Sequence, residues 1–233
     1  MSGYVGTELE IFETAHNWKR YILSQLQPHI RGRVLEVGAG IGGTTRFLSQ
    51  APHEQWFCLE PDARLAGEIR EACASGRLPP SVRVQTGVVN DLPEDAAFDS
   101  ILYIDVLEHI EDDREELERA SRRLSRGGTL VVFGPAMQWL YSPFDAAIGH
   151  YRRYNRESLE RAMPAGFEPV AVKYLDCAGV LLSLANRLLL RNPYPTRKQI
   201  EVWDRAVVPV SRRLDPVIRF ATGKSILGVW RKR

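Results

Sequence analysis

The sequence predicts an α/β fold, in which a doubly wound, mostly parallel sheet of seven strands carries a helical insert before its last strand. Two observations predict it. Short apolar segments rich in β-branched residues alternate with amphipathic segments of helical spacing, which is typical of a sheet covered by helices on both faces. The first strand also runs directly into a glycine-rich turn, "GAGIGG" at 38–43, that opens a helix. In such sheets, ligands bind beyond the carboxyl ends of the strands.

The elements follow from the periodicity of apolar residues. An amphipathic helix is expected at about 8–28, because Leu9, Phe12, Trp18 and Ile22 recur at helical spacing. Strands are expected at 33–38, 55–60, 82–89, 98–105, 127–136, 168–175 and 224–230. Further helices are expected at 44–50, 62–76, 111–125 and 156–167. A structureless loop of about 48 residues is unusual in a compact domain, so the segment before the last strand is predicted to be a helical insert.

The composition is that of an ordinary soluble protein, with 44% hydrophobic and 26% charged residues. The three cysteines are far apart and form neither a disulfide framework nor a metal motif, which favours a reducing compartment. The first residues lack the basic and apolar regions of a signal peptide, and no apolar run reaches the roughly 20 residues that span a bilayer. We therefore expect a cytoplasmic protein.

The charge is distributed unevenly along the chain. Residues 1–172 contain 18 Lys+Arg and 25 Asp+Glu, whereas residues 173–233 contain 13 Lys+Arg and 4 Asp+Glu. A basic C-terminal quarter suits contact with phosphates, anionic lipid or nucleic acid. A solvated, arginine-rich face is an equally good interpretation.

The glycine-rich turn by itself fits two cofactors. A glycine loop after the first strand lets the backbone approach a dinucleotide or a nucleoside closely. Glu60, at the end of the second strand, can accept hydrogen bonds from the two ribose hydroxyls that both cofactors offer. Glu36 distinguishes them, because a carboxylate two residues before Gly38 repels a pyrophosphate and attracts the cationic end of S-adenosyl-L-methionine (SAM). The alternative is a strand carboxylate that a neighbouring group satisfies.

Five segments in a fixed order agree with SAM. They are "VLEVGAGIG", "CLEPD", "NDLP", "FDSILYIDVLEHI" and "LSRGGTLVV", within residues 30–175. Together they resemble the class I SAM-dependent methyltransferases, in particular the bacterial small-molecule group that includes the ubiquinone-pathway O-methyltransferases. The resemblance implies a Rossmann-like methyltransferase sheet, SAM as cofactor and S-adenosyl-L-homocysteine (SAH) as product.

The resemblance also implies cofactor contacts at the ends of the first four strands. The residues concerned are Glu36, Gly38, Ala39 and Gly40 for the methionine end, Glu60 and Pro61 for the ribose, Val89, Asn90 and Asp91 for the adenine, and Ile104 and Asp105 beside the sulfonium. One position departs from the family pattern. Many relatives have "GD" after the third strand, where this chain has Gly87-Val88. The adenine is therefore expected to contact the backbone of Val89 and either Asn90 or Asp91.

A hydroxyl acceptor benefits from a general base with a pKa near neutral, which is usually a histidine. The first candidate is His150 in "SPFDAAIGHYRRYNRES", with Asp145 to orient it or to act as the base itself. His109, after the fourth strand, is the second. Aromatic walls and arginines suit an acceptor with an anionic group, and the predicted substrate residues are Trp139, Tyr141, Tyr151, Arg152, Arg153 and Tyr154. Structural histidines and surface arginines are the alternative.

Four units are expected along the chain. Residues 1–30 form a helix that covers the cofactor site, 31–175 the SAM-binding core, 176–223 a basic and apolar insert, and 224–233 the final strand with a basic tail. The insert suits a lid, a homodimer contact, or a surface that lies on the inner membrane face through residues 178–220. The expected partner is a small-molecule or lipid-linked acceptor.

The leading hypothesis is methylation of a small or lipid- or sugar-linked acceptor at oxygen with a histidine base. N-methylation, RNA methylation and a non-catalytic SAM-binding role remain as alternatives. Methylation of DNA bases is disfavoured, because Asp105-Val106-Leu107-Glu108 stands where DNA amino-methyltransferases carry an Asn/Asp-Pro-Pro-aromatic motif. No His/Asp/Glu cluster shows ligand spacing along the chain, so the sequence predicts no metal site.

Overall fold

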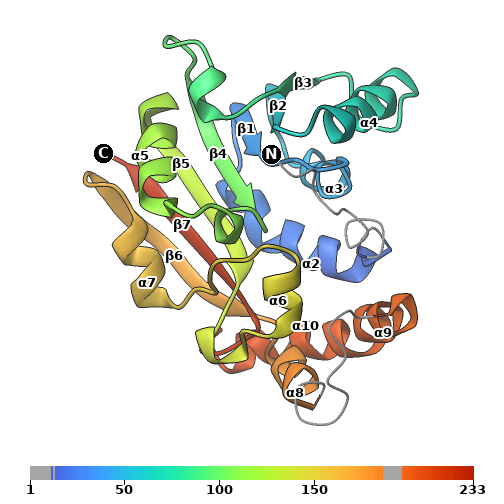
Figure 1. The fold of residues 1–233 in the computed structure, drawn as a ribbon. Coiled ribbons are helices and arrows are strands. Elements are labelled where there is room, and N and C mark those ends of the chain that lie inside the picture. Colours follow the sequence, from blue (N-terminus) through green and yellow to red (C-terminus); the bar gives the residue numbers. More distant parts are fainter. Residues whose placement is uncertain (1–11, 13, 186–195) are drawn as a thin grey trace.

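The computed structural model describes residues 12, 14–185 and 196–233, and its sheet has seven strands in the order β3-β2-β1-β4-β5-β7-β6 (Figure 1). The strands are β1 (Arg33–Val37), β2 (Gln55–Glu60), β3 (Val82–Thr86), β4 (Phe98–Ile104), β5 (Leu124–Pro135), β6 (Phe167–Leu175) and β7 (Ser225–Lys232). β7 is antiparallel to both of its neighbours, and the strands from β3 to β5 are parallel. The predicted fold class, a mostly parallel seven-stranded sheet, is confirmed.

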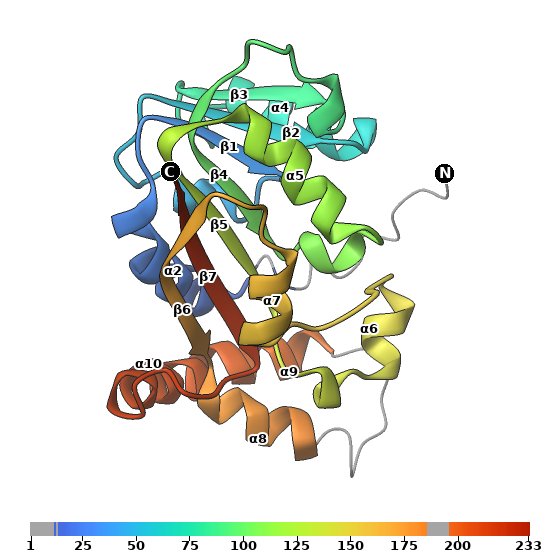
Figure 2. The same cartoon turned by 90° about the vertical axis from the view of Figure 1, so that its left-hand side faces the viewer.

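Helices lie on both faces of this sheet (Figure 2). They are α2 (His16–Leu26), α3 (Thr45–Leu48), α4 (Ala63–Ala74), α5 (Asp113–Arg123), α6 (Pro143–Ala147), α7 (Arg156–Ala162), α8 (Cys177–Ala185), α9 (Arg197–Val202) and α10 (Val208–Val217). A π-helical turn, Trp203–Val207, joins α9 to α10. Helices α8 to α10 occupy the long connection between β6 and β7, as the predicted insert requires.

The central strands bury side chains on both faces, which is why they read as continuous apolar runs in the sequence. Val34 belongs to the core under α2 and the insert, and the next residue, Leu35, belongs to the core under α5 and α7. Leu102 and Tyr103 alternate in the same way on β4. Two layers of helices therefore cover the central strands, so that a ligand is expected at the strand ends.

The observed elements differ from the expected ones mainly at their ends. The helix expected at 8–28 begins at His16 within the described part, while residues 1–11 and 13 lie outside it. The helix after the glycines is a single turn, α3, and β5 begins three residues before the expected strand. α6 was not expected at all. Its capping box, in which the Asp145 side chain accepts from the Ser142 backbone, is the local signal for it.

Helix α2 is tied to the insert by buried carboxylates. Asp204, in the π-helical turn, accepts hydrogen bonds from the backbone N–H groups of Asn17 and Trp18 at 3.2 and 2.8 Å, so it caps the start of α2. The Tyr21 hydroxyl donates to Asp215 of α10 at 2.7 Å. These contacts link residues 186 to 194 positions apart and hold α2 against the insert.

Candidate active site

The glycine-rich turn bends sharply as it leaves β1, because three of its glycines have positive φ. Gly38 has φ +67°, and its N–H donates to the carbonyl of Leu59 at 2.7 Å. A Cβ added there would lie 2.6 Å from Cγ2 of Val106, which follows β4. The turn therefore packs directly on the end of β4, at the point where the strand order reverses and a ligand is expected. A side chain at Gly38 would prevent this close packing of the turn on the end of β4.

Glu60 is held rigidly at the end of β2. Its two carboxylate oxygens accept hydrogen bonds from the backbone N–H groups of Gly40 at 2.8 Å and Asp62 at 3.0 Å. Its side chain is buried, and burial raises its pKa above the ordinary value. Each oxygen keeps a lone pair for a further donor, as pairing with two vicinal hydroxyls requires.

Glu36 points into the protein from β1, and one oxygen already has two donors. Thr45 Oγ1 and Trp56 Nε1 donate to its Oε2 at 2.9 and 2.8 Å. Burial raises its pKa to about 7, against the opposing effect of these two donors. Glu36 also lines the cavity described below. Glu36 is therefore hydrogen-bonded within the protein, as the alternative interpretation holds, and it also faces the cavity, as a cofactor contact requires.

At the expected adenine end, Val89 lines the cavity and Asn90 and Asp91 do not. The Asp91 carboxylate accepts from the backbone N–H of Val88 at 2.8 Å. Gly87, with φ +147°, leaves room for it, since a Cβ there would lie 2.7 Å from Asp91 Oδ2. The Asp91 side chain therefore orders its own turn, and the roles assigned to Asn90 and Asp91 remain predictions without a contact to the cavity.

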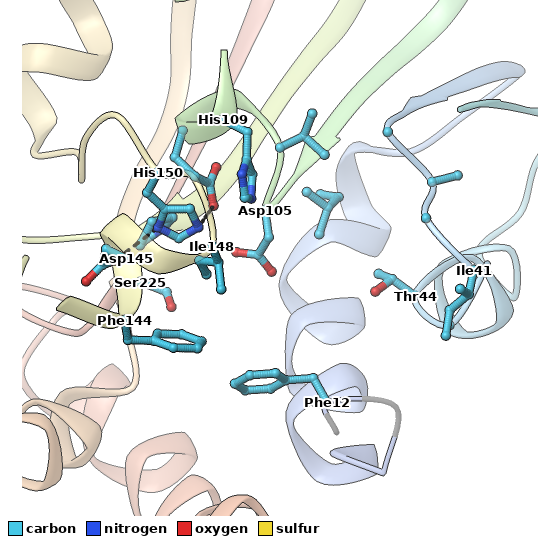
Figure 3. Close-up of a pocket in the computed structure, with 18 of the residues that line it drawn as sticks. Phe12, Ile41, Thr44, Asp105, His109, Phe144, Asp145, Ile148, His150 and Ser225 are labelled. Carbon is cyan, nitrogen blue, oxygen red and sulfur yellow. Dashed lines mark hydrogen bonds and ion pairs between the residues drawn. The ribbon is translucent and has the colours of Figure 1, made fainter. Parts of the chain in front are cut away.

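A cavity of about 1690 Å³ extends from the glycine-rich turn to the insert. The predicted cofactor residues that line it are Glu36, Gly38, Ala39, Gly40, Glu60, Pro61, Val89, Ile104 and Asp105. Beyond them the walls are largely apolar, and Phe12 and Phe144 approach from opposite sides (Figure 3). SAH-sized ligands need only part of this space, because drug-sized sites run from roughly 300 to 1,000 Å³. The remainder can hold an acceptor beside the cofactor.

His150 lies on the cavity wall with a fully buried carboxylate behind it. Its Nδ1 is 3.0 Å from Oδ1 of Asp145, which also accepts from the Arg153 guanidinium at 2.8 and 3.0 Å. Ser142 donates to the same carboxylate at 2.8 Å through both its N–H and its hydroxyl. Burial raises the pKa of Asp145, but the hydrogen bonds from His150 and Arg153 outweigh it and hold the pKa below its usual range. An ionised Asp145 keeps the proton of His150 on Nδ1 and leaves Nε2 as an acceptor.

Glu108 and His109 complete this wall. Figure 3 shows His109 next to His150. Glu108 is 1% exposed, and neither of its carboxylate oxygens has a hydrogen-bond partner within the described residues. His150 Nε2 lies 3.8 Å from Glu108 Oε1, too far for a hydrogen bond. The rings of His109 and His150 meet edge to face, with centroids 4.5 Å apart. Burial and the neighbouring His150 lower the pKa of His109 to about 4.

The predicted substrate residues are placed differently. Arg153 alone among them lines the cavity, and its guanidinium is occupied by Asp145. Arg152 forms an ion pair with Asp113 at 2.7 Å outside the cavity, and Trp139 and Tyr151 are exposed. The hydroxyls of the two remaining tyrosines, Tyr141 and Tyr154, donate within the protein to the carbonyl of His150 and to the Asp113 carboxylate, respectively.

Other residues, which were not among the predicted site residues, line the rest of the cavity. They include Phe12, Trp18, Ile22, Leu140, Phe144, Ile148, Leu182, Val202, Trp203 and Lys224. Phe12, Trp18 and Ile22 had a local signal in their helical spacing, and Phe144 and Ile148 stand four residues apart. Lys224 contacts the Trp203 ring at 3.9 Å and Asp176 at 3.5 Å.

Comparison with known proteins identifies the domain. Residues 35–130 match the family described as "Methyltransferase domain". The chain therefore contains a methyltransferase domain, as the predicted resemblance to the class I SAM-dependent methyltransferases implies. The predicted methyltransferase family is thereby confirmed, and SAM is the cofactor of that class.

The relatives of this methyltransferase are distant. The chain is 24% identical over 181 residues to the ajmaline N-methyltransferase of Rauvolfia serpentina, which covers 77% of this chain and 57% of that protein. It is 29% identical over 104 residues to the sarcosine/dimethylglycine N-methyltransferase of Aphanothece halophytica, covering 44% and 38%. The chain thus spans little more than half, or less, of these curated relatives. Among solved structures, geranyl diphosphate methyltransferase in complex with SAM superposes with a TM-score of 0.66 at 16% identity, covering 100% of this chain and 93% of that one.

Within residues 12, 14–185 and 196–233, no helix combines the length and the apolar character needed to cross a bilayer.

Proposed function

We propose that this methyltransferase binds SAM over the glycine-rich turn and transfers its methyl group to a hydroxyl of an acceptor in the adjoining apolar cavity. The observation that carries the proposal is the pair of His150 and Asp145 on the wall of the cavity that also contains Gly40 and Glu60. Methyl transfer needs a nucleophile aligned with the sulfonium, so two adjoining compartments in one cavity are what the chemistry requires.

The cofactor half follows from the fixed groups at the ends of β1 and β2. Glu60 accepts from the ribose hydroxyls with the lone pairs that Gly40 and Asp62 leave free. Glu36 supplies negative charge beneath the turn for the cationic methionine end. Asp105, which is open to the cavity, borders the sulfonium.

In the transfer step, an oxygen lone pair of the acceptor attacks the methyl carbon. The carbon–sulfur bond breaks, its electron pair stays on sulfur, and SAH is released. The hydroxyl proton passes to Nε2 of His150, the nitrogen that Asp145 leaves unprotonated. His109, next to it, is kept neutral by burial, and its N–H is directed to the backbone of Ile148 and Gly149.

The size and apolar lining of the cavity favour an apolar, lipid-linked acceptor. Leu182 of α8 and Val202 of α9 line the cavity and are exposed to solvent. Leu181 of α8 is 70% exposed. Val217 of α10 is 76% exposed and is close in sequence to arginines of the basic quarter. Apolar and basic side chains at one end of the molecule suit a membrane surface from which such an acceptor enters.

A basic amine is the second candidate acceptor, and a specific observation favours it. Glu108 is buried without a hydrogen bond, and Asp105 is open to the same cavity. Two carboxylates facing one space attract a cationic amine. The two curated relatives above are both described as N-methyltransferases.

The test uses SAM labelled on its methyl group, purified protein and a cell extract partitioned between organic and aqueous phases. Label in the organic phase that depends on His150 supports the lipid-linked hydroxyl acceptor. Retention of label in His150→Ala, together with its loss in Glu108→Gln, supports the amine instead. Glu60→Ala should abolish SAH binding in calorimetry, and undiminished affinity in that variant would contradict the cofactor site. Arg161→Ala, an exposed change on α7 that lies outside the cavity, is the matched control for folding.

A further inference from the structure

The wall formed by Glu108, His109 and His150 has the composition of a metal site. The three side chains each offer one ligand atom, and these atoms all lie within 4.8 Å of one another. We propose that they bind a divalent transition-metal ion such as Zn²⁺, and that the ion holds the acceptor hydroxyl. This inference rests on the proposed function and deepens it.

The first argument is the unsatisfied carboxylate. Both oxygens of Glu108 are buried without a hydrogen bond, although a buried carboxylate normally has several partners. The charged groups near it are Asp105, Asp145 and the guanidinium of Arg153, so acids outnumber the cations around Glu108. A divalent cation satisfies the orphaned oxygens and offsets this excess of negative charge.

The second argument is the spacing. His150 Nε2 and Glu108 Oε1 are 3.8 Å apart, too far for a hydrogen bond. Two ligands on a tetrahedral zinc ion, at about 2.0–2.2 Å from it, stand roughly 3.4 Å from each other. An ion between these atoms therefore requires a shift of only a few tenths of an ångström.

The third argument is the support behind both histidines. Asp145 fixes Nδ1 of His150, so that Nε2 presents its lone pair to Glu108. His109 is held by hydrogen bonds to the backbone of Ile148 and Gly149. Metal-bound histidines almost always donate their other N–H to a carboxylate or a backbone carbonyl, and both forms occur here.

Two histidines and one carboxylate leave coordination positions open toward the cavity. An acceptor hydroxyl bound at such a position loses its proton more easily, because the ion stabilises the oxyanion. In the metal-loaded protein His150 is then a ligand, the proton leaves to solvent, and the oxyanion attacks the methyl group. In the metal-free protein His150 remains the base described above.

Calorimetric titration of the chelator-treated full chain with ZnCl₂ tests the site directly. We expect one ion per chain, with affinity at least tenfold weaker in Glu108→Gln and in His109→Ala. His29→Ala removes a histidine beyond the opposite ends of the strands and should leave the affinity unchanged. Titration with CoCl₂ gives a visible absorption band for nitrogen–oxygen coordination, which should weaken in the same two variants. SAH affinity within twofold of the wild type shows that each variant is folded.

Absence of one-to-one binding, or equal binding by wild type and Glu108→Gln, would overturn the metal site. In that case methyl transfer by the chelator-treated protein would leave the proposed function standing. Zinc binding that depends on Glu108, together with no SAH binding, would support the metal site and contradict the proposed function.

Discussion

Replacement of Gly38 by alanine is expected to destabilise the protein in two ways. The left-handed backbone disfavours a side chain, and the new methyl group overlaps Val106. Gly38 has φ +67°, and a Cβ there would lie 2.6 Å from Cγ2 of Val106. Gly76, at the end of α4, has nearly the same backbone, φ +73°, but nothing lies within 4 Å of its Cβ position. Gly76→Ala therefore measures the backbone cost alone, about 1–2 kcal/mol.

Gly38→Ala should cost more, because the new methyl group overlaps a β-branched side chain that has little freedom to turn. Overpacking typically adds about 1–3 kcal/mol, so the total loss in free energy of unfolding is expected at about 2–5 kcal/mol. Urea unfolding measures the stability, and calorimetry with SAH measures the function. We expect weaker SAH binding in Gly38→Ala and unchanged SAH binding in Gly76→Ala.

Val106→Ala in the Gly38→Ala background completes the experiment. It removes the atoms that the methyl group overlaps, so the double variant should be more stable than the sum of the two single changes predicts, by about 1–3 kcal/mol. Equal losses in Gly38→Ala and Gly76→Ala, or strict additivity of the double variant, would refute the close packing of this turn on the end of β4.

Three further changes test other parts of the structure. The pKa of Glu36 is about 7 in the folded protein against an ordinary 4.5, so its burial favours the protonated form and stability should fall as the pH rises from about 4.5 to 7. Glu36→Gln should remove up to about 3 kcal/mol of this dependence in urea unfolding at several pH values, and an unchanged profile would contradict it. Asp204→Ala removes the carboxylate that caps α2 and should lower the free energy of unfolding by about 1–2 kcal/mol, whereas no loss would argue against the cap. Tyr21→Phe removes the hydroxyl that donates to the buried Asp215, so it should lower the free energy of unfolding by about 1–2 kcal/mol in the same assay. The SAH affinity of this variant shows whether it is folded.

The fold could be predicted in detail because its signals are local. The run that became β1 carries residues for both faces of the sheet, and Asp62 caps α4 through its own side chain, accepting from the next turn. The ends of the elements were less certain, since α3 stops after one turn and α6 depends on a capping box of four residues. Neither feature changes the alternation of strands and helices from which the fold class follows.

The site was predicted unevenly for the same reason. Glu36, Gly38 and Glu60 stand at strand ends, where the chain itself fixes their position. Arg152 and Tyr154 were grouped with His150 only by closeness in sequence, and the structure gives them partners such as Asp113 outside the cavity. Short sequence separation does not decide on which side of a loop a side chain lies.

The sequence by itself determined the sheet, the glycine-rich turn and the cofactor class, because each depends on residues only a few positions apart. Only the tertiary structure brought His150 beside Glu108 and His109, and Phe12 opposite Phe144, since these contacts join segments whose distance along the chain carries no pairing signal. The apolar half of the cavity is formed by packing between α2, α6 and the insert. A contact between distant segments depends on how whole helices pack on the sheet. This packing is determined by the shapes of the helix and sheet surfaces together.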